Sequence, residues 1–192
     1  MSSLTISGDT SGQITIDAPA VSGTNTQTLV AATGTLAPLI SGTAVASTSG
    51  TSIDFTSIPS WVKRITIMLS GVSTNGTSLI QVQIGASSVV TSGYLGTGGE
   101  LRAAPDVANF TAGFGLSPTP AAADVIHGIV TIVNITATTW VYSFVGGTSN
   151  APTNLVGGGS SASLSGALDR VRVTTVLGVD TFDAGTINIM YE

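Results

Sequence analysis

The chain has 192 residues, of which 42% are apolar and only 8% charged, and it contains no cysteine and a single histidine. Five basic residues stand against ten acidic ones, which gives a formal net charge of −5. Such a surface repels phosphate backbones, so we expect no nucleic-acid partner. The lack of cysteine excludes disulfide frameworks and thiolate metal sites, so we expect stability from burial and hydrogen bonding alone.

The N-terminus and the apolar runs bear on targeting. Residues 1–5 hold no cationic segment followed by an apolar core, which argues against a secretory signal. The longest apolar runs, such as residues 129–133, fall far short of the roughly 20 residues that a membrane-spanning helix needs. We therefore expect a soluble protein made in a cytoplasm, with no membrane partner.

Residues 4–40 consist of short β-capable pieces separated by turn formers, and no aromatic residue occurs before Phe55. At roughly 25 cal/mol per Å² of buried apolar surface, so few apolar side chains cannot offset roughly 1–2 kcal/mol per residue of backbone ordering. This segment is therefore predicted to be an extended, β-rich arm that lies on another surface or braids with copies of itself. A disordered tail is the alternative.

Residues 41–50 contain only Ser, Gly, Thr and Ala apart from one Val, which is a composition typical of a linker. We therefore divide the chain into an anchoring arm with its linker, residues 1–50, and a folded domain, residues 51–192.

The folded domain carries a dense series of predicted strands. Residues 65–69 and 79–84 lie on either side of an Asn-Gly turn, and their alternation predicts a hairpin. Residues 126–135 and 139–145 predict another hairpin around a three-residue turn. Further strands are expected at residues 168–177 and 186–191.

Regular strands, Gly-rich turns and the lack of a capped helical pattern predict an all-β fold. We expect an antiparallel, jelly-roll-like β-sandwich preceded by the extended N-terminal arm. Its predicted core consists of Phe55, Trp61, Ile65, Ile67, Leu69, Val82, Ile84, Ile132, Trp140, Tyr142 and Val173.

Two glycine-rich segments, residues 96–99 and 157–161, look like phosphate-binding loops. Neither has the lysine or the following helix that would hold the anion, so both are expected to be turns.

His127 follows Asp124 by three residues, with many serines nearby, which is a set of residue types that a hydrolase triad uses. No nucleophile-elbow sequence is present, and a strand-edge histidine is the preferred interpretation. Asp180 and Asp183 offer too few oxygens for calcium and are expected to cap a loop. We expect neither catalysis nor a metal or other cofactor.

Trp61 lies beside Lys63 and Arg64, an arrangement that suits stacking on a sugar or a cation–π contact. The preferred interpretation is that the indole closes one end of the sandwich.

Residues 51–66, together with the endings 168–175 and 180–192, resemble a module of tailed-bacteriophage structural proteins. Residues 7–20 and 24–26 resemble the repetitive N-terminal strips of phage appendages. The resemblance implies a virion protein, with other virion proteins of the capsid or tail as partners and three-fold symmetry, and it carries no catalytic residues.

The preferred function is a non-enzymatic virion structural protein whose arm anchors it while the sandwich projects as a capsid decoration or short fibre. The alternative is a tail-fibre module that recognises a bacterial surface glycan. A depolymerising enzyme is a third class, disfavoured because paired carboxylates in an aromatic cleft are not evident.

Anchoring is expected by strand addition, to a shell protein or within a homotrimer, because exposed strand edges pair with other chains. The arm's main apolar groups, which we expect to make this contact, are Ile14, Ile16, Leu29 and Val30.

Overall fold

The computed structural model describes residues 3–7, 11–17, 37–117, 120–122 and 124–192. The chain divides into two compact units, Met1–Leu36 and Ala37–Glu192. Within the described residues the regular structure is almost entirely β-strand, and the helical content is a single 3-10 turn, η1 (Val176–Gly178). The prediction of an all-β protein is confirmed. No helix in this part of the chain is long and apolar enough to cross a membrane.

The first unit contains an antiparallel hairpin of β1 (Ser3–Ser7) and β2 (Gln13–Asp17). Its register places Ile6 opposite Ile14 and Thr5 opposite Thr15. The alternation of apolar and hydroxyl residues therefore gives each face of the hairpin its own chemistry.

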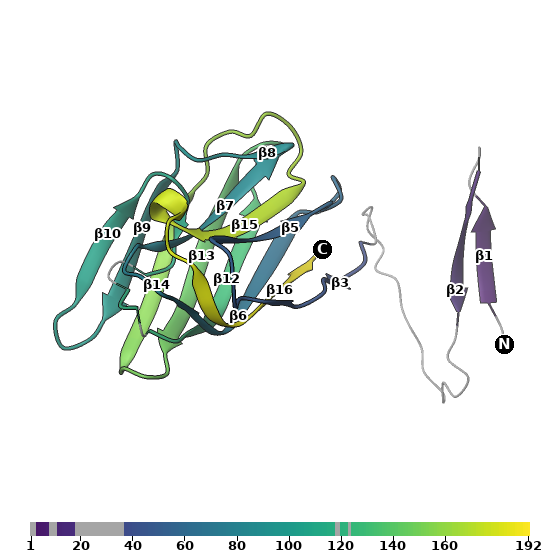
Figure 1. Ribbon diagram of the computed structural model, residues 1–192. Coiled ribbons are helices and arrows are strands. Elements are labelled where there is room, and N and C mark those ends of the chain that lie inside the picture. Colours follow the sequence, from purple (N-terminus) through teal and green to yellow (C-terminus); the bar gives the residue numbers. More distant parts are fainter. Residues whose placement is uncertain (1–2, 8–10, 18–36, 118–119, 123) are drawn as a thin grey trace. The chain divides into compact units, whose positions relative to one another are not determined.

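The second unit is an antiparallel sandwich whose described strands form a nine-stranded and a five-stranded sheet (Figure 1). In spatial order, the larger sheet consists of β10 (Asp106–Phe110), β9 (Leu95–Leu101), β14 (Thr153–Ser160), β13 (Trp140–Thr148), β12 (Ile126–Asn134), β6 (Arg64–Thr74), β16 (Phe182–Tyr191) and β3 (Ile40–Ser41), with β4 (Val45–Ala46) also on β16. The smaller sheet consists of β11 (Phe114–Gly115), β7 (Ile80–Ala86), β15 (Arg170–Thr175) and β5 (Ser52–Thr56), with β8 (Ser88–Val89) on β7.

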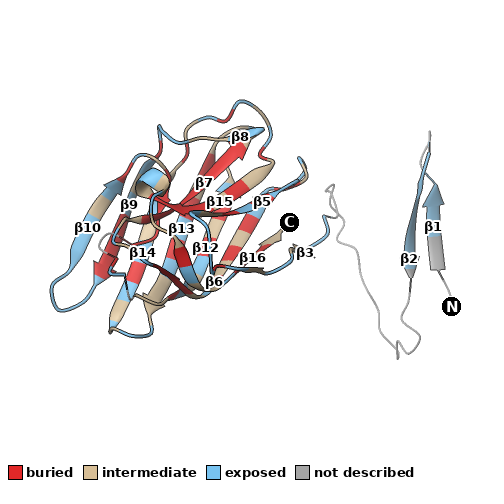
Figure 2. Ribbon diagram, in the orientation of Figure 1, coloured by how far each residue is buried: buried red, intermediate tan, exposed pale blue. Residues whose placement is uncertain are grey.

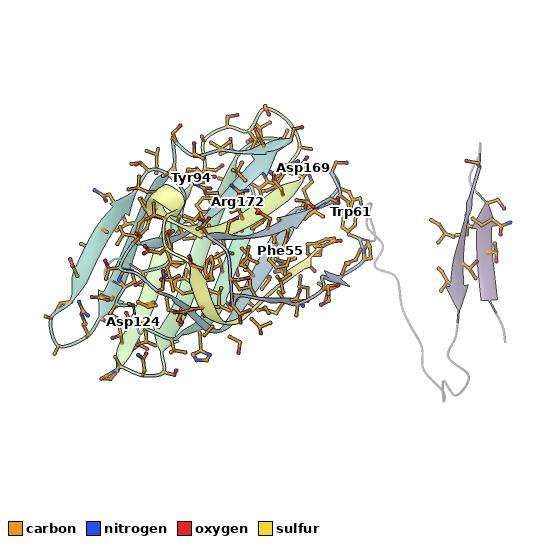
Figure 3. The ribbon with its side chains drawn as sticks, in the orientation of Figure 1. Phe55, Trp61, Tyr94, Asp124, Asp169 and Arg172 are labelled. Carbon is orange, nitrogen blue, oxygen red and sulfur yellow. The ribbon has the colours of Figure 1, made fainter. Side chains whose placement is uncertain are left out.

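The core lies between these sheets, and the buried positions alternate along β12, β13 and the first half of β6 (Figure 2). Ile65 and Ile67 of β6 face it from the larger sheet, and Val171 and Val173 of β15 face it from the smaller one. Every predicted core residue except Trp61 is buried. Trp61 keeps 38% of its surface exposed and packs tilted against Tyr191, with ring centroids 6.1 Å apart (Figure 3). The indole therefore covers the edge of the core and does not fill it.

The predicted hairpin over residues 126–145 is confirmed. β12 and β13 pair antiparallel, with Val130 opposite Phe144 and Ile132 opposite Tyr142. The turn is short, so the local signal alone sets this pairing.

The predicted hairpin of residues 65–69 and 79–84 is wrong. β6 pairs with β12 and β16 in the larger sheet, whereas β7 pairs with β15 and β11 in the smaller sheet. The segment after β6 therefore crosses from one layer to the other, which its length permits because packed sheets lie only about 10 Å apart. Two hydrogen bonds hold the start of this crossing: the Asn75 backbone N–H donates to the Thr181 carbonyl at 2.9 Å, and the Thr181 N–H donates to the Asn75 side-chain oxygen at 2.9 Å.

The sandwich also begins earlier than Thr51. The segment expected to be a linker lies along β16, where β3 and β4 pair with it. Ser47 is fully buried, and its hydroxyl donates to the carbonyl of Ala184 at 2.8 Å. The composition of this segment is typical of a linker because its small residues show no alternation of apolar and polar side chains. Its backbone nevertheless pairs with the edge of β16, whose backbone groups would otherwise lack partners.

The two glycine-rich segments are strands, which corrects their expected assignment as turns. Residues 96–99 belong to β9 and residues 157–160 to β14, and the two strands pair with each other. Aromatic side chains lie against these glycines: a Cβ on Gly157 would come within 2.9 Å of the Tyr142 hydroxyl, and one on Gly98 within 2.9 Å of the Phe110 ring. Glycine is needed there because the rings occupy the space of a side chain.

Two buried tyrosines extend this aromatic layer. Phe114 stacks on Tyr142 with centroids 4.5 Å apart and meets Tyr94 edge-on at 5.0 Å. The Tyr142 hydroxyl donates to the carbonyl of Gly115 at 3.0 Å, and that of Tyr94 to the carbonyl of Val90 at 3.0 Å. Burial raises the pKa of both tyrosines to about 12, because the phenolate would lose its hydration.

Candidate functional site

The hairpin of the first unit carries an apolar face that is exposed to solvent. Ile6, Ile14 and Ile16 keep 54%, 69% and 57% of their surface exposed (Figure 2). Ile14 and Ile16 are two residues apart on one strand, and Ile6 is paired opposite Ile14, so all three lie on the same side. We call this set the hairpin face.

The opposite side of the hairpin is polar. Thr5 and Thr15 face each other there, with hydroxyl oxygens 3.5 Å apart. Gln13 and Ser7, a paired position at the end of the hairpin, are also exposed. The hairpin is thus amphipathic, although nothing within its described residues covers the apolar side.

Two of the four predicted anchoring residues, Ile14 and Ile16, are on the hairpin face. The other two, Leu29 and Val30, lie outside the described residues. Ile6 was not predicted, although the signal was present: residues 4–6 and 13–16 share the same alternation, and a Gly-containing turn separates them.

A second exposed apolar set lies on the outer face of the larger sheet. The register aligns Ile129, Val145 and Val156 across three neighbouring strands, and Val107 follows beyond Gly99. All four side chains are exposed. Residues paired in this way form a continuous ridge across the strands, which we call the sheet row.

His127 contacts a serine but is not arranged as its base. Its Nδ1 accepts a hydrogen bond from the Gly71 backbone N–H at 3.2 Å, so a neutral imidazole carries its proton on Nε2. That nitrogen lies 3.2 Å from the Ser149 hydroxyl and donates to it, whereas a general base must accept the serine proton. Asp124 does not orient the ring, because its carboxylate accepts from the backbone of Ala121 at 2.8 Å.

The backbone around His127 explains its bonding. Gly71 and Gly185 both have positive φ, of 67° and 97°, and β6 is irregular in its pairing with both of its neighbours there. A Cβ on Gly185 would lie 2.4 Å from the Gly71 carbonyl oxygen. These bulges turn the Gly71 N–H away from the ladder, and the histidine accepts it, so His127 has a structural role.

Asp180 caps a loop, as predicted. Its Oδ2 accepts from the Ser78 backbone N–H at 2.7 Å. Asp183 lies within β16, so the expectation that it caps a loop is wrong, and its carboxylate accepts a hydrogen bond from the hydroxyl of Ser73. Each carboxylate thus has its own partner within the protein. Among the described residues, no group of three or more metal-ligating acidic, histidine or cysteine side chains occurs.

The arginines of the chain are neutralised by nearby carboxylates. Arg172 forms two bonds with Asp54, of 2.7 and 3.2 Å, and Arg170 forms the same arrangement with Asp169. The hydrogen bond from Arg170 lowers the pKa of Asp169 below its usual range. Arg64 and Arg102 pair with Glu192 and Glu100.

Comparison with known proteins gives no match to this chain, whether with family models, curated sequences or solved structures. The geometry of its own residues therefore has to carry the functional conclusion.

Proposed function

We propose that this chain is a non-enzymatic structural protein of a tailed-bacteriophage virion. Its N-terminal arm attaches it to the particle, and its β-sandwich projects as a capsid decoration or short fibre. The observation that carries this proposal is the hairpin face, in which isoleucines are exposed on a unit separate from the sandwich.

The energetics of the hairpin support a role in attachment. A two-stranded hairpin is marginally stable in water, because it has no second layer against which to bury its apolar side. Burying an isoleucine side chain is worth about 1.5–3 kcal/mol. A partner that covers Ile6, Ile14 and Ile16 would therefore supply stability that the hairpin cannot gain alone.

The partner proposed for this face is another virion protein, either a shell protein or further copies of the same chain. Strand addition at an edge of β1 or β2 would satisfy backbone groups and cover the isoleucines in one step. A homotrimer is the preferred assembly, because the resemblance to phage fibres and decorations implies it and because closed rings satisfy identical apolar faces together.

The hydrogen bonds of His127, Asp180 and Asp183 support a structural role without catalysis. The serine–histidine contact has the wrong proton arrangement for a nucleophile, and Asp180 and Asp183 are occupied by the protein's own groups. The chain would be made in the cytoplasm of the bacterial host and function in the virion.

The test is to replace Ile14 and Ile16 by Asp in the full chain and measure its copy number on purified particles by quantitative immunoblotting. Asp at these positions would introduce charge into the proposed contact, so we expect release from the particle. The matched control places Asp at Thr5 and Thr15, on the polar side of the same hairpin, and should keep full occupancy. Immunogold imaging of intact particles would locate the protein on capsid or tail.

Full occupancy of the isoleucine variant would contradict anchoring by the arm. The sheet row would then be the contact, and Val145→Lys should release the protein instead. Failure of an antibody to label any particle would overturn the virion assignment itself.

A further inference from the structure

The outer face of the smaller sheet holds a cavity of about 400 Å³. Its floor comes from β7 and β15, through Gln81, Gln83, Arg172 and Thr174, and η1 forms part of its rim. The volume falls within the range of about 300–1,000 Å³ that small-molecule sites occupy.

The floor is unusual because its polar side chains point outward from the core and are nevertheless buried. Val82 and Val173 face the core, so their neighbours in sequence, Gln81 and Thr174, face away from it. Only 1% of Gln81 is exposed, and Gln83 and Thr174 are also buried. Surrounding segments therefore cover these polar side chains and shield them from bulk water.

Part of this patch is satisfied by the protein itself. Gln83 donates from its side-chain nitrogen to the carbonyl of Ala112 at 2.9 Å, and Thr174 donates to the carbonyl of Thr51 at 2.8 Å. These bonds hold the two side chains in place. The floor is thus organised before any ligand arrives, which lowers the entropic cost of binding.

Another polar group of this patch has no hydrogen-bond partner within the described part of the protein. Gln81, which lines the cavity, has a buried side-chain oxygen with no hydrogen-bond partner among the described residues. Unpaired buried polar atoms are costly, and native proteins keep few of them without a reason. The terminal torsion of a glutamine is broad, so the Gln81 amide can turn to meet a group bound beside it.

The charge of the cavity restricts the ligand. Arg172, labelled in Figure 3, is the charged residue of its lining. Its guanidinium is already neutralised by two bonds to Asp54. Its remaining N–H groups can donate to a neutral oxygen, but an anion would have to compete with Asp54. With a net charge of −5, the protein as a whole also disfavours anions.

Leu177 gives the rim an apolar contact. It belongs to η1, has a positive φ of 73°, and keeps 86% of its surface exposed. A bulky residue in this conformation is strained, and such strain is concentrated at binding sites and switches. A hydrogen bond from the Val176 N–H to the Leu79 carbonyl, 2.7 Å long, fixes the start of this turn.

We propose that this cavity binds an uncharged sugar residue of a glycan. A sugar presents hydroxyl groups, which both donate and accept, to the amides, hydroxyls and N–H groups of the floor. Its ring also has an apolar C–H side, which suits Leu177 at the rim. This assignment does not depend on the virion role proposed above, because it rests on a different unit of the chain.

Saturation-transfer NMR on the full chain tests the proposal with glucose, galactose, rhamnose and N-acetylglucosamine, together with the anionic partners glucuronate and galacturonate. We expect saturable binding of at least one uncharged sugar and weaker binding of its uronate. Gln81→Met keeps the volume but removes the amide, and should weaken binding about tenfold or more, the loss of roughly one hydrogen bond. The control Gln13→Met makes the same change outside the cavity and should bind as the wild type does.

A structural role for these residues predicts different results. Gln81→Met should not lower the melting temperature, because its oxygen has no protein partner to lose. Leu177→Gly removes the strained side chain and should raise the melting temperature while weakening sugar binding severalfold. The proposal is wrong if no uncharged sugar binds, if both cavity variants bind like the wild type, or if a uronate binds more tightly than its neutral partner.

Discussion

The tripeptide Ile-Thr-Ile occurs in both units of this protein, at residues 14–16 and 65–67, with opposite outcomes. In β6 the two isoleucines are fully buried, whereas in β2 they keep more than half of their surface exposed. The local structure is the same, a strand with its apolar residues on one face. The difference lies in what covers that face: in the sandwich the opposing sheet does so, and in the hairpin no described part of the unit does. The apolar face of an amphipathic strand has to be covered by another surface. Within the described residues, the chain itself covers that face in β6 but not in β2.

The largest expected effect comes from placing the same charges in both copies of the tripeptide. Ile65→Asp with Ile67→Asp should prevent the sandwich from folding, because an unpaired carboxylate in the core costs more than about 4–5 kcal/mol. Ile14→Asp with Ile16→Asp should leave the melting temperature of the sandwich unchanged. Circular dichroism melts of the isolated protein provide the measurement. A large loss of stability in the hairpin variant would mean that the hairpin face is covered within the chain.

A strongly alkaline pH should distinguish the two units without any mutation. The pKa of Tyr94 and of Tyr142 is about 12 in the folded state, against an ordinary value of 10.0. The contribution of the two protonated tyrosines to the free energy of unfolding is therefore complete below pH 10 and is lost as the pH rises from about 10 to 12. Each tyrosine should account for about 3 kcal/mol of this loss. Denaturant unfolding followed by tryptophan fluorescence reports on the sandwich, which contains every aromatic residue of the chain.

Tyr142→Phe provides the control for the alkaline transition. It should cost about 1 kcal/mol at neutral pH, since the bond to the Gly115 carbonyl is lost. It should also remove about half of the dependence on pH. An unchanged pH dependence would show that neither the burial nor the raised pKa of Tyr142 contributes.

The boundary between the units can be tested by truncation. A fragment of residues 37–192 should melt cooperatively at the temperature of the full chain. A fragment of residues 51–192 lacks β3, β4 and the buried Ser47, and should lose about 2–4 kcal/mol, a few hydrogen bonds at about 1 kcal/mol each. Equal stability of the two fragments would return the boundary to Thr51 and make residues 37–50 a linker after all.

The smallest effects are expected for a partly exposed ion pair of the sandwich and for the polar side of the hairpin. Asp169→Asn removes the pair with Arg170 and the charge that accepts the Ser87 N–H, and should lower the melting temperature only slightly at pH 7. The pKa of Asp169 is lowered, so its contribution is present above the ordinary value of 3.8 and disappears as the pH falls through the folded-state pKa. Melting of the variant and the wild type should therefore converge in acid, and a constant difference would contradict this explanation. Thr15→Ala in the hairpin should change the melting temperature even less.

The sequence by itself determined the elements whose signals are local. Alternation placed Ile65, Ile67 and Val173 toward the core, and a three-residue turn sufficed to pair β12 with β13. It also identified Ile14 and Ile16 as apolar groups in a segment too poor in apolar surface to bury them. These results follow from the side-chain period of a strand and from the geometry of a short turn, which depend on neighbouring residues alone.

The tertiary structure alone decided which strands share a sheet and what each face meets. β6 and β7 are separated by an apparent hairpin turn but lie in different layers, because the backbone partner of a strand is chosen by contacts far away in sequence. The glycines of β9 and β14 form strands because the rings of Phe110 and Tyr142 occupy their side-chain space. The cavity at Gln81 arises in the same way: it needs β7, β15 and η1 together, and no single segment carries its pattern.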